Sequence, residues 1–152
     1  MFLVFFFMQT SECNIKSLHA SCKIDWSFDI NCTTVNTKIV SQIKKWTSDD
    51  NCKHGGEKCL YTLISYTAKH TTPVHHYLDD LTFSFTAPST GSCAVHGYST
   101  SEIWYAVLDY GTNYCNLHNL ITGCGLNKEP GYKEVTDNSK CTQYTSANCD
   151  KY

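Results

Sequence analysis

The spacing of apolar residues predicts one amphipathic helix in the first third of the chain. The apolar residues between Ile39 and Trp46 recur at the helical period, with polar residues on the opposite side. A helix over 35–46 accommodates this stripe, and Thr33 or Thr34 can supply the oxygen that caps its N-terminus. The loop-forming residues that follow the stripe end the helix there.

Beyond residue 60 the period changes to two. In the segment 75–85, Leu81, Phe83 and Phe85 occupy odd positions, while threonine and serine occupy the even positions that follow. Because successive side chains of a strand point to opposite faces, the odd face is expected inside and the even face in solvent. A strand with one buried face is therefore predicted here.

Similar alternation predicts further strands, joined by turns rich in glycine and polar residues. They cover 26–30, 60–66, 94–99, 103–110 and 114–121, with a three-residue hairpin connection at 111–113. Short connections favour antiparallel neighbours. One helix cannot cover both faces of such a sheet, so the sheet curls toward a barrel or leaves one face wet. The expected fold is mainly β, an antiparallel sheet curled toward a barrel with one N-terminal helix.

Length and charge narrow the class of protein. A chain of 152 residues is the size of one domain, and we place a single domain at 20–152. The net charge of -2 argues against a nucleic-acid partner, which requires a concentrated excess of basic residues. No apolar run approaches the roughly 20 residues of a membrane-spanning helix.

Cysteine is the strongest compositional signal. An even number of cysteines spread along a chain of this size indicates a disulfide framework formed in an oxidising compartment. The closest two are Cys52 and Cys59, a wider spacing than structural zinc sites use. We expect local pairs Cys52–Cys59 and Cys141–Cys149, each across a turn-rich segment. The ten cysteines are Cys13, Cys22, Cys32, Cys52, Cys59, Cys93, Cys115, Cys124, Cys141 and Cys149.

Two further features favour secretion. The apolar run that opens the chain fits the core of a secretory signal, for which we take residues 1–11, atypical or truncated because a basic start and a clear cleavage site are missing. The triplet beginning at Asn31 is an N-glycosylation sequon. We therefore expect an extracellular protein with a candidate glycan at Asn31.

Histidine and carboxylate side chains are the candidates for a metal site or an acid–base pair. His70 and His76 share strand parity, whereas His75 points to the opposite face. A zinc site could take its third ligand, His96 or His118, from another strand, but exposed histidines are the simpler interpretation. Asp79 and Asp80 are adjacent, so on a strand they point to opposite faces and cannot form an acid–base pair. Enzyme signature motifs are absent. We expect no metal, no cofactor and no enzymatic activity.

Aromatic residues make up 13% of the chain and concentrate on the predicted strands. They form either a core of cross-strand pairs or the wall of a cavity for a small amphipathic molecule. On the second interpretation the candidate ligand-binding residues are Tyr66, Tyr77, Phe83, Phe85, Tyr98 and Trp104.

Two family resemblances bear on these alternatives. The stretch Trp104 to Cys115, with Asp109-Tyr110 before a turn and an aromatic after it, resembles the second motif of lipocalins, although the N-terminal Gly-x-Trp motif is absent. This implies an eight-stranded barrel and an extracellular carrier of small molecules. One helix on an antiparallel sheet also resembles cystatins, and Cys93 to Gly97 shares the valine and glycine of their inhibitory hairpin. That implies an α+β fold.

The function expected from the sequence is secreted, non-enzymatic binding of a small apolar or amphipathic ligand, as a carrier or scavenger. The alternative is a protein-facing module such as a protease inhibitor, a toxin or a cell-surface interaction protein. An enclosed apolar pocket favours the first, whereas a solid core with aromatic side chains displayed on loops favours the second.

Overall fold

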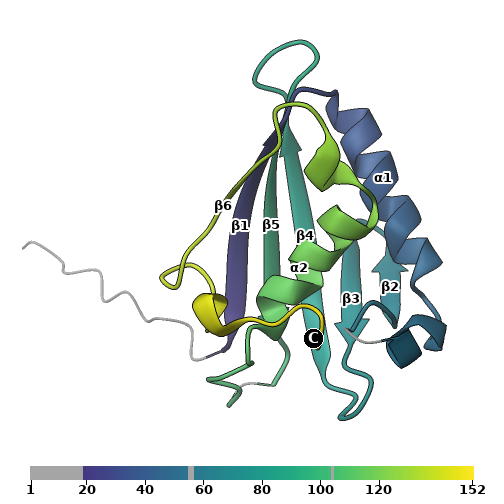
Figure 1. The fold of residues 1–152 in the computed structure, drawn as a ribbon, viewed down its shortest axis with the longest axis vertical. Helices are drawn as coiled ribbons and strands as arrows, with labels where there is room; N and C mark the ends of the chain where they lie inside the picture. Colours follow the sequence, from purple (N-terminus) through teal and green to yellow (C-terminus); the bar gives the residue numbers. More distant parts are fainter. Residues whose placement is uncertain (1–18, 55–56, 104) are drawn as a thin grey trace, which may run out of the picture.

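The computed structural model describes residues 19–54, 57–103 and 105–152, and shows a six-stranded antiparallel sheet with two helices on one face (Figure 1). The strand order is β2-β3-β4-β5-β1-β6. The sheet is open, so the fold is α+β and the predicted curl toward a lipocalin-like barrel is wrong. The second helix helps to bury the inner face of the sheet, which closure into a barrel would otherwise have buried. The other face of the sheet is exposed to solvent.

Strand β1, Ser21–Phe28, lies between β5 and β6. Its even-numbered residues, from Cys22 to Phe28, are buried under the helices and its odd-numbered ones are more accessible. The strand predicted at 26–30 therefore begins five residues earlier. The reason is that the residues before Trp26, including the buried Ile24, also pair with β5. Strand β1 contributes two aromatic residues, Trp26 and Phe28, to the hydrophobic core.

Helix α1, Cys32–Lys45, confirms the predicted helix and buries Val35, Ile39 and Ile43. The expected cap is wrong, because the side chain of Asn31 accepts from the backbone N–H of Thr34 at 2.8 Å. Asparagine caps at least as well as threonine. A 3-10 turn, η1 Asp50–His54, follows the helix.

The next four strands form a meander: β2 Tyr61–Ile64, β3 Thr67–Thr71, β4 Leu78–Thr86 and β5 Cys93–Ser101. In β4 the odd-numbered residues face the helices, with Leu81 fully buried and Phe83 partly buried. Thr82, Ser84 and Thr86 are exposed on the other face. The predicted orientation is confirmed within β4, but residues 75–77 of the predicted strand 75–85 form an exposed loop, so His75 and Tyr77 do not face the core.

Helix α2, Thr112–Gly123, replaces two predicted elements, the hairpin connection at 111–113 and the strand at 114–121. Leu117, Leu120 and Ile121 fall at the helical period and are fully buried. Buried polar residues fill the positions between them, so the apolar stripe does not stand out from the sequence. The described part of 103–110 forms a loop, not the predicted strand.

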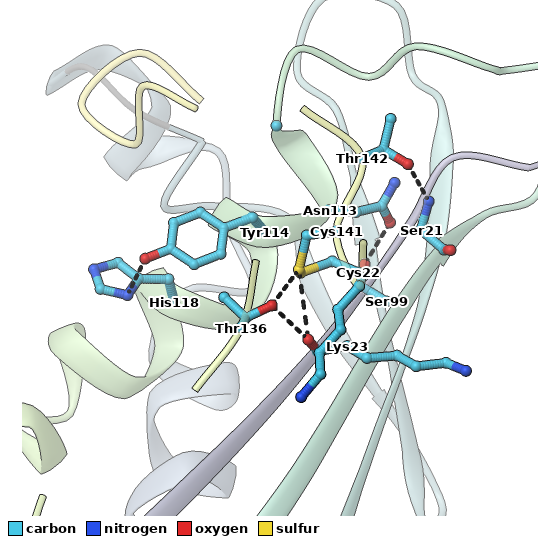
Figure 2. The surroundings of a disulfide bond; sticks show 12 residues. Ser21, Cys22, Lys23, Ser99, Asn113, Tyr114, His118, Thr136, Cys141 and Thr142 are labelled. Carbon is cyan, nitrogen blue, oxygen red and sulfur yellow. Dashed lines mark hydrogen bonds between the residues drawn. A yellow bond between two sulfur atoms is a disulfide. The ribbon is translucent and has the colours of Figure 1, made fainter. Parts of the chain in front are cut away.

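After η2, Leu126–Lys128, the C-terminal tail returns along β1 as strand β6, Lys133–Val135, and ends near a 3-10 turn, η3 Tyr144–Ser146. Figure 2 shows how the tail is attached: Cys141 is bonded to Cys22, and the Thr136 hydroxyl donates to the Lys23 carbonyl at 2.8 Å. The backbone N–H of Ser21 donates to the Thr142 hydroxyl at 3.2 Å. The tail thereby covers the free edge of β1.

Four disulfides among the described residues stabilise the fold, as is typical of proteins that fold in an oxidising compartment. Cys52–Cys59 is confirmed, whereas Cys141–Cys149 is wrong, because the tail crosses both the sheet and α2 and each cysteine meets a different partner. Cys124 is a free thiol in the described part of the chain. Cys13 and the expected signal at 1–11 lie outside the described residues. The disulfides are Cys22–Cys141, Cys32–Cys93, Cys52–Cys59 and Cys115–Cys149.

Candidate ligand pocket

A pocket of about 620 Å³ opens at the end of the sheet where β4 begins and β5 ends. Its lining comes from the loop 72–77, the loop 102–111 and the last residue of the tail. The two loops lie at the lower end of the molecule in Figure 1. Its volume is within the range that accommodates small organic ligands. The lining residues are Glu57, Thr72, His75, Tyr77, Asp79, Ser101, Ile103, Tyr105, Ala106, Val107, Leu108, Asp109, Tyr110, Thr112 and Tyr152.

Asp79 and Ser101, on the floor of the pocket, belong to a buried polar network between the sheet and α2. The side-chain amide of Asn116 donates to Asp79 Oδ2 at 2.7 Å, and the hydroxyl of Ser99 donates to Asn113 Oδ1 at 2.6 Å, a contact also drawn in Figure 2. The amide of Asn113 in turn donates to Ser101 Oγ at 3.1 Å. Such networks hold their members in fixed orientations when every group is paired.

Asp109 connects this network to the start of α2. Its Oδ1 accepts from the backbone N–H of Gly111 at 3.1 Å, and its Oδ2 accepts from the backbone and side-chain N–H groups of Asn113 at 3.0 and 2.9 Å. A carboxylate at this place satisfies N–H groups that a helix leaves unpaired and complements its dipole. The oxygens of Asp109 are therefore used in structural hydrogen bonds, although the residue also lines the pocket.

The carboxyl group of Glu57 differs from that of Asp109 because one of its oxygens is not hydrogen-bonded to any described residue. Its Oε2 atom is buried and has no hydrogen-bond partner among the described residues. Burial, and secondly the nearby charge of Asp79, raise the pKa of Glu57 to about 7. Burial likewise raises the pKa of Asp79 and outweighs the hydrogen bonds from Asn116 and Ser101, which lower it. The pocket thus holds desolvated carboxyl groups whose charged forms lack full compensation.

His70 lies behind this floor, on β3 between Tyr61 and Asp79 in the register of the sheet. Its ring is fully buried and stands 4.6 Å from the ring of Tyr61. Burial lowers the pKa of His70 to about 4, so the ring is neutral at physiological pH. It therefore supplies no positive charge to the floor.

The walls and rim are aromatic and aliphatic. Tyr110 and Tyr152 stack with ring centroids 6.2 Å apart, and His75 stacks on Tyr77 at 5.2 Å. Val107, together with its neighbours in the loop 102–111, is largely exposed at the mouth. The loop is held in place by the side chain of Gln143, whose Oε1 accepts from the backbone N–H groups of Asp109 and Tyr110 at 3.0 and 2.7 Å.

The candidate ligand-binding residues are dispersed in the structure. Tyr77 lines the pocket, whereas Phe83 and Phe85 pack against the core at the other end of β4, with Phe83 stacked on Trp26 at 6.4 Å. Tyr98 lies on the open face of the sheet beneath the ammonium group of Lys23. Tyr66 is 98% exposed in the β2–β3 turn, and Trp104 lies outside the described residues.

The histidines considered for metal binding are also separated. His70 is buried on β3, but the strand ends at Thr71, so His75 and His76 belong to an exposed loop. His96 pairs with Asp25 on the open face, and His118 pairs with Glu134 under the tail. In the part of the chain that the structure describes, no cluster of three or more His, Cys, Asp or Glu residues is placed to hold a metal ion.

The sequence reasoning missed most of the pocket because its residues come from loops. Glu57 carries no recognisable signal in the sequence. Asp79 does carry one: it shares the odd parity of Leu81 and Phe83, which places a carboxyl group on the buried face of the strand. Asp80, on the other face, forms an ion pair with Lys69 at 2.6 Å. The prediction that this acidic pair divides between the two faces is confirmed.

In the described ranges, no helix combines the length and apolarity needed to cross a bilayer. The sequon residue Asn31 is exposed at the start of α1, beside the bridged Cys32.

Comparison with protein-family models, curated proteins and solved structures finds no match for this chain.

Proposed function

We propose that this protein is a secreted, non-enzymatic binding protein that holds a small amphipathic molecule in the pocket between the loops 72–77 and 102–111. The observation that carries the proposal is the combination of apolar walls with a few fixed polar groups at the floor, the usual composition of a ligand site. The four disulfides support a role outside the cell.

Ligand-dependent thermal melting tests this function. The panel contains fatty acids, fatty alcohols, alkylamines and aromatic amines. A ligand present at 100 times its Kd adds about 2.7 kcal/mol to the free energy of unfolding, so a true ligand raises the melting temperature clearly. If no member of the panel raises it, the proposal is wrong.

Two valines of similar exposure provide a matched pair of variants. Val107 lines the pocket and is 60% exposed, whereas Val135 on β6 is 56% exposed and lies away from it. Val107→Trp places an indole at the mouth and should weaken binding at least tenfold. Val135→Trp should leave binding unchanged, and equal effects of the two substitutions would contradict the location of the site.

The second candidate is a protein-facing module, favoured by the apolar rim. Val74, Tyr105, Val107, Leu108 and Tyr110 are each more than half exposed around one end of the molecule. Exposed apolar patches of this kind also mark protein-binding surfaces. A panel without any small-molecule ligand, together with loss of a protein partner on Val107→Trp, would favour this function instead.

A further inference from the structure

We propose that the pocket selects an organic cation, a primary amine attached to an apolar or aromatic body, over neutral and anionic molecules of the same shape. This inference rests on the proposed function and names the class of ligand. Three independent features of the pocket support it: the sign of its buried charges, the unused acceptor capacity of its floor, and the chemistry of its walls.

The charges that line the pocket are acidic. Glu57, Asp79 and Asp109 contribute carboxyl groups, and none of the described lining residues is lysine. The chain contains no arginine at all. The lysine nearest in the sheet register, Lys69, is directed to the opposite face, where it pairs with Asp80 and Glu102. A carboxylate or phosphate ligand would therefore meet like charges without a cationic partner.

Two of the carboxyl groups retain acceptor capacity. Both oxygens of Asp109 already accept hydrogen bonds at the start of α2. Asp79 accepts from the side chains of Asn116 and Ser101, which leaves part of its acceptor capacity unused. Glu57 Oε2 is buried without any partner in the described residues. Each carboxylate oxygen has two lone pairs, and an ammonium group has three donors and no acceptor. An amine can therefore satisfy Glu57 and Asp79 together.

The floor also favours a cation electrostatically. Burial raises the pKa values of both Glu57 and Asp79. The charge of Asp79 adds to the effect on Glu57, and the charges of Asp109 and Asp80 add to the effect on Asp79, so neither negative charge is fully compensated. A bound ammonium group supplies the missing counter-charge. The same low-dielectric surroundings that penalise the isolated carboxylates strengthen their attraction to a cation.

The walls suit the remainder of such a molecule. Tyr77, Tyr110 and Tyr152 present aromatic rings to the pocket, and ring faces attract ammonium groups and pack against apolar bodies. Ile103 and the exposed aliphatic residues of the loop 102–111 extend the apolar surface toward the mouth. An amphipathic amine can thus place its charge on the floor and its body along the walls.

Three isosteric probes test the selectivity: phenylbutylamine, phenylbutanol and phenylbutanoate, titrated into the full chain by calorimetry near pH 8. We expect the amine to bind at least tenfold more tightly than the alcohol, and the acid to bind more weakly than either. Equal binding of amine and alcohol would overturn the inference and leave the proposed function standing. If none of the three probes binds, both the selectivity for amines and the proposed binding function are wrong for ligands of this size.

Charge-removing variants locate the effect. Glu57→Gln and Asp79→Asn should each lower the affinity for phenylbutylamine about tenfold and change that for phenylbutanol no more than twofold. Asp80→Asn, the same change one residue away on the opposite face, is the matched control and should leave both affinities within twofold. Because Asp79 is buried, far-UV circular dichroism verifies that its variant folds, and Glu57→Gln carries the test if it does not. An unchanged amine affinity in Glu57→Gln would overturn the inference.

Discussion

At the scale of single residues, the most consequential group is the Glu57 carboxyl, because its pKa of about 7 lies in the physiological range. Burial is the main cause and the charge of Asp79 the second. Lowering the pH through this value protonates the group and removes one of the charges proposed to hold an ammonium ion. The other ionisable groups around this floor are Tyr61, His70, His75, Asp79 and Asp109.

The affinity for an amine should therefore depend on pH. Primary amines stay protonated between pH 5.5 and pH 8, so the change comes from the protein. We expect the affinity for phenylbutylamine to fall roughly tenfold per pH unit below about pH 7, because one proton must leave Glu57 for each amine bound. Calorimetric titrations across this range measure it. In Glu57→Gln this slope should flatten, and a slope as steep as in the wild type would contradict the assignment.

A second residue-scale site, remote from the pocket floor, stabilises the tail. The carboxyl group of Glu134 accepts from Trp26 Nε1 at 2.9 Å and from the Tyr114 hydroxyl at 2.8 Å, and pairs with His118 at 2.9 Å. Burial alone would raise the pKa of Glu134, but the hydrogen bonds from His118 and Trp26 outweigh it and lower the pKa.

Glu134→Gln should destabilise the protein by about 2 kcal/mol at neutral pH, because it weakens several charge-assisted hydrogen bonds at once. A lowered carboxyl pKa adds stability above the ordinary value of 4.5, and this contribution disappears as the pH falls through the folded-state value. Urea melts at pH 7 and pH 3 should show the difference shrinking. Glu129→Gln, which breaks the more exposed pair with Lys38, should cost less than about 1 kcal/mol.

At the scale of elements, the junction between the loop 102–111 and α2 places the pocket rim. Gly111 precedes α2 with a φ of +80°, and a Cβ atom there would stand 2.7 Å from the backbone of Ala147. The preceding residue, Tyr110, also has a positive φ. Backbone conformation and close approach of the tail both require glycine at this position.

Gly111→Ala should therefore destabilise the protein by about 2–3 kcal/mol and weaken ligand binding, because the loop must shift away from the tail. Gly91→Ala is the matched control, since Gly91 has a similar φ of +81° but open space around it. Its cost should be about 1 kcal/mol, without effect on binding. Thermal melts and titrations of both variants measure these values, and equal costs would show that contact with Ala147 is unimportant.

The elements also show where sequence patterns are informative. The strand β4 and the helix α1 were predictable because their apolar residues keep one period without interruption. The helix α2 was not, because Asn113, Asn116 and Asn119 are buried among its apolar residues and bond to the sheet or the tail. Polar residues at buried positions hide the helical period, and two of them bond to Asp79 and Ser101, which line the pocket. Most of the pocket lining comes from loops, which have no period at all, so the sequence pattern could not indicate the site either.

At the scale of the whole molecule, the disulfides connect layers that are distant in sequence. Cys22–Cys141 joins residues 119 positions apart, whereas Cys52–Cys59 closes a separation of seven. In the chain-entropy description, a disulfide restricts the unfolded state more when the loop that it closes is longer. The contribution of the two bonds to stability should therefore differ.

Replacing Cys22 and Cys141 together by alanine should cost roughly 4–5 kcal/mol, against roughly 2–3 kcal/mol for Cys52 and Cys59 replaced together. Denaturant melts of the two double variants, followed by tyrosine and tryptophan fluorescence, measure the difference. Equal costs, or a larger cost for the short loop, would show that the tail is held by its hydrogen bonds to β1 and not by the covalent link.

The covered edge of β1 also bears on how the molecule behaves at high concentration. The exposed sheet edges are the short strands β2 and β6, while the eight-residue β1 is hidden behind the tail. Short edges are poor templates for pairing with another chain, whereas a long one is a good template. Reduction of Cys22–Cys141 would release the tail and expose β1. Reducing conditions, which break this bond together with the other disulfides, should therefore convert a well-dispersed protein into one that assembles edge to edge.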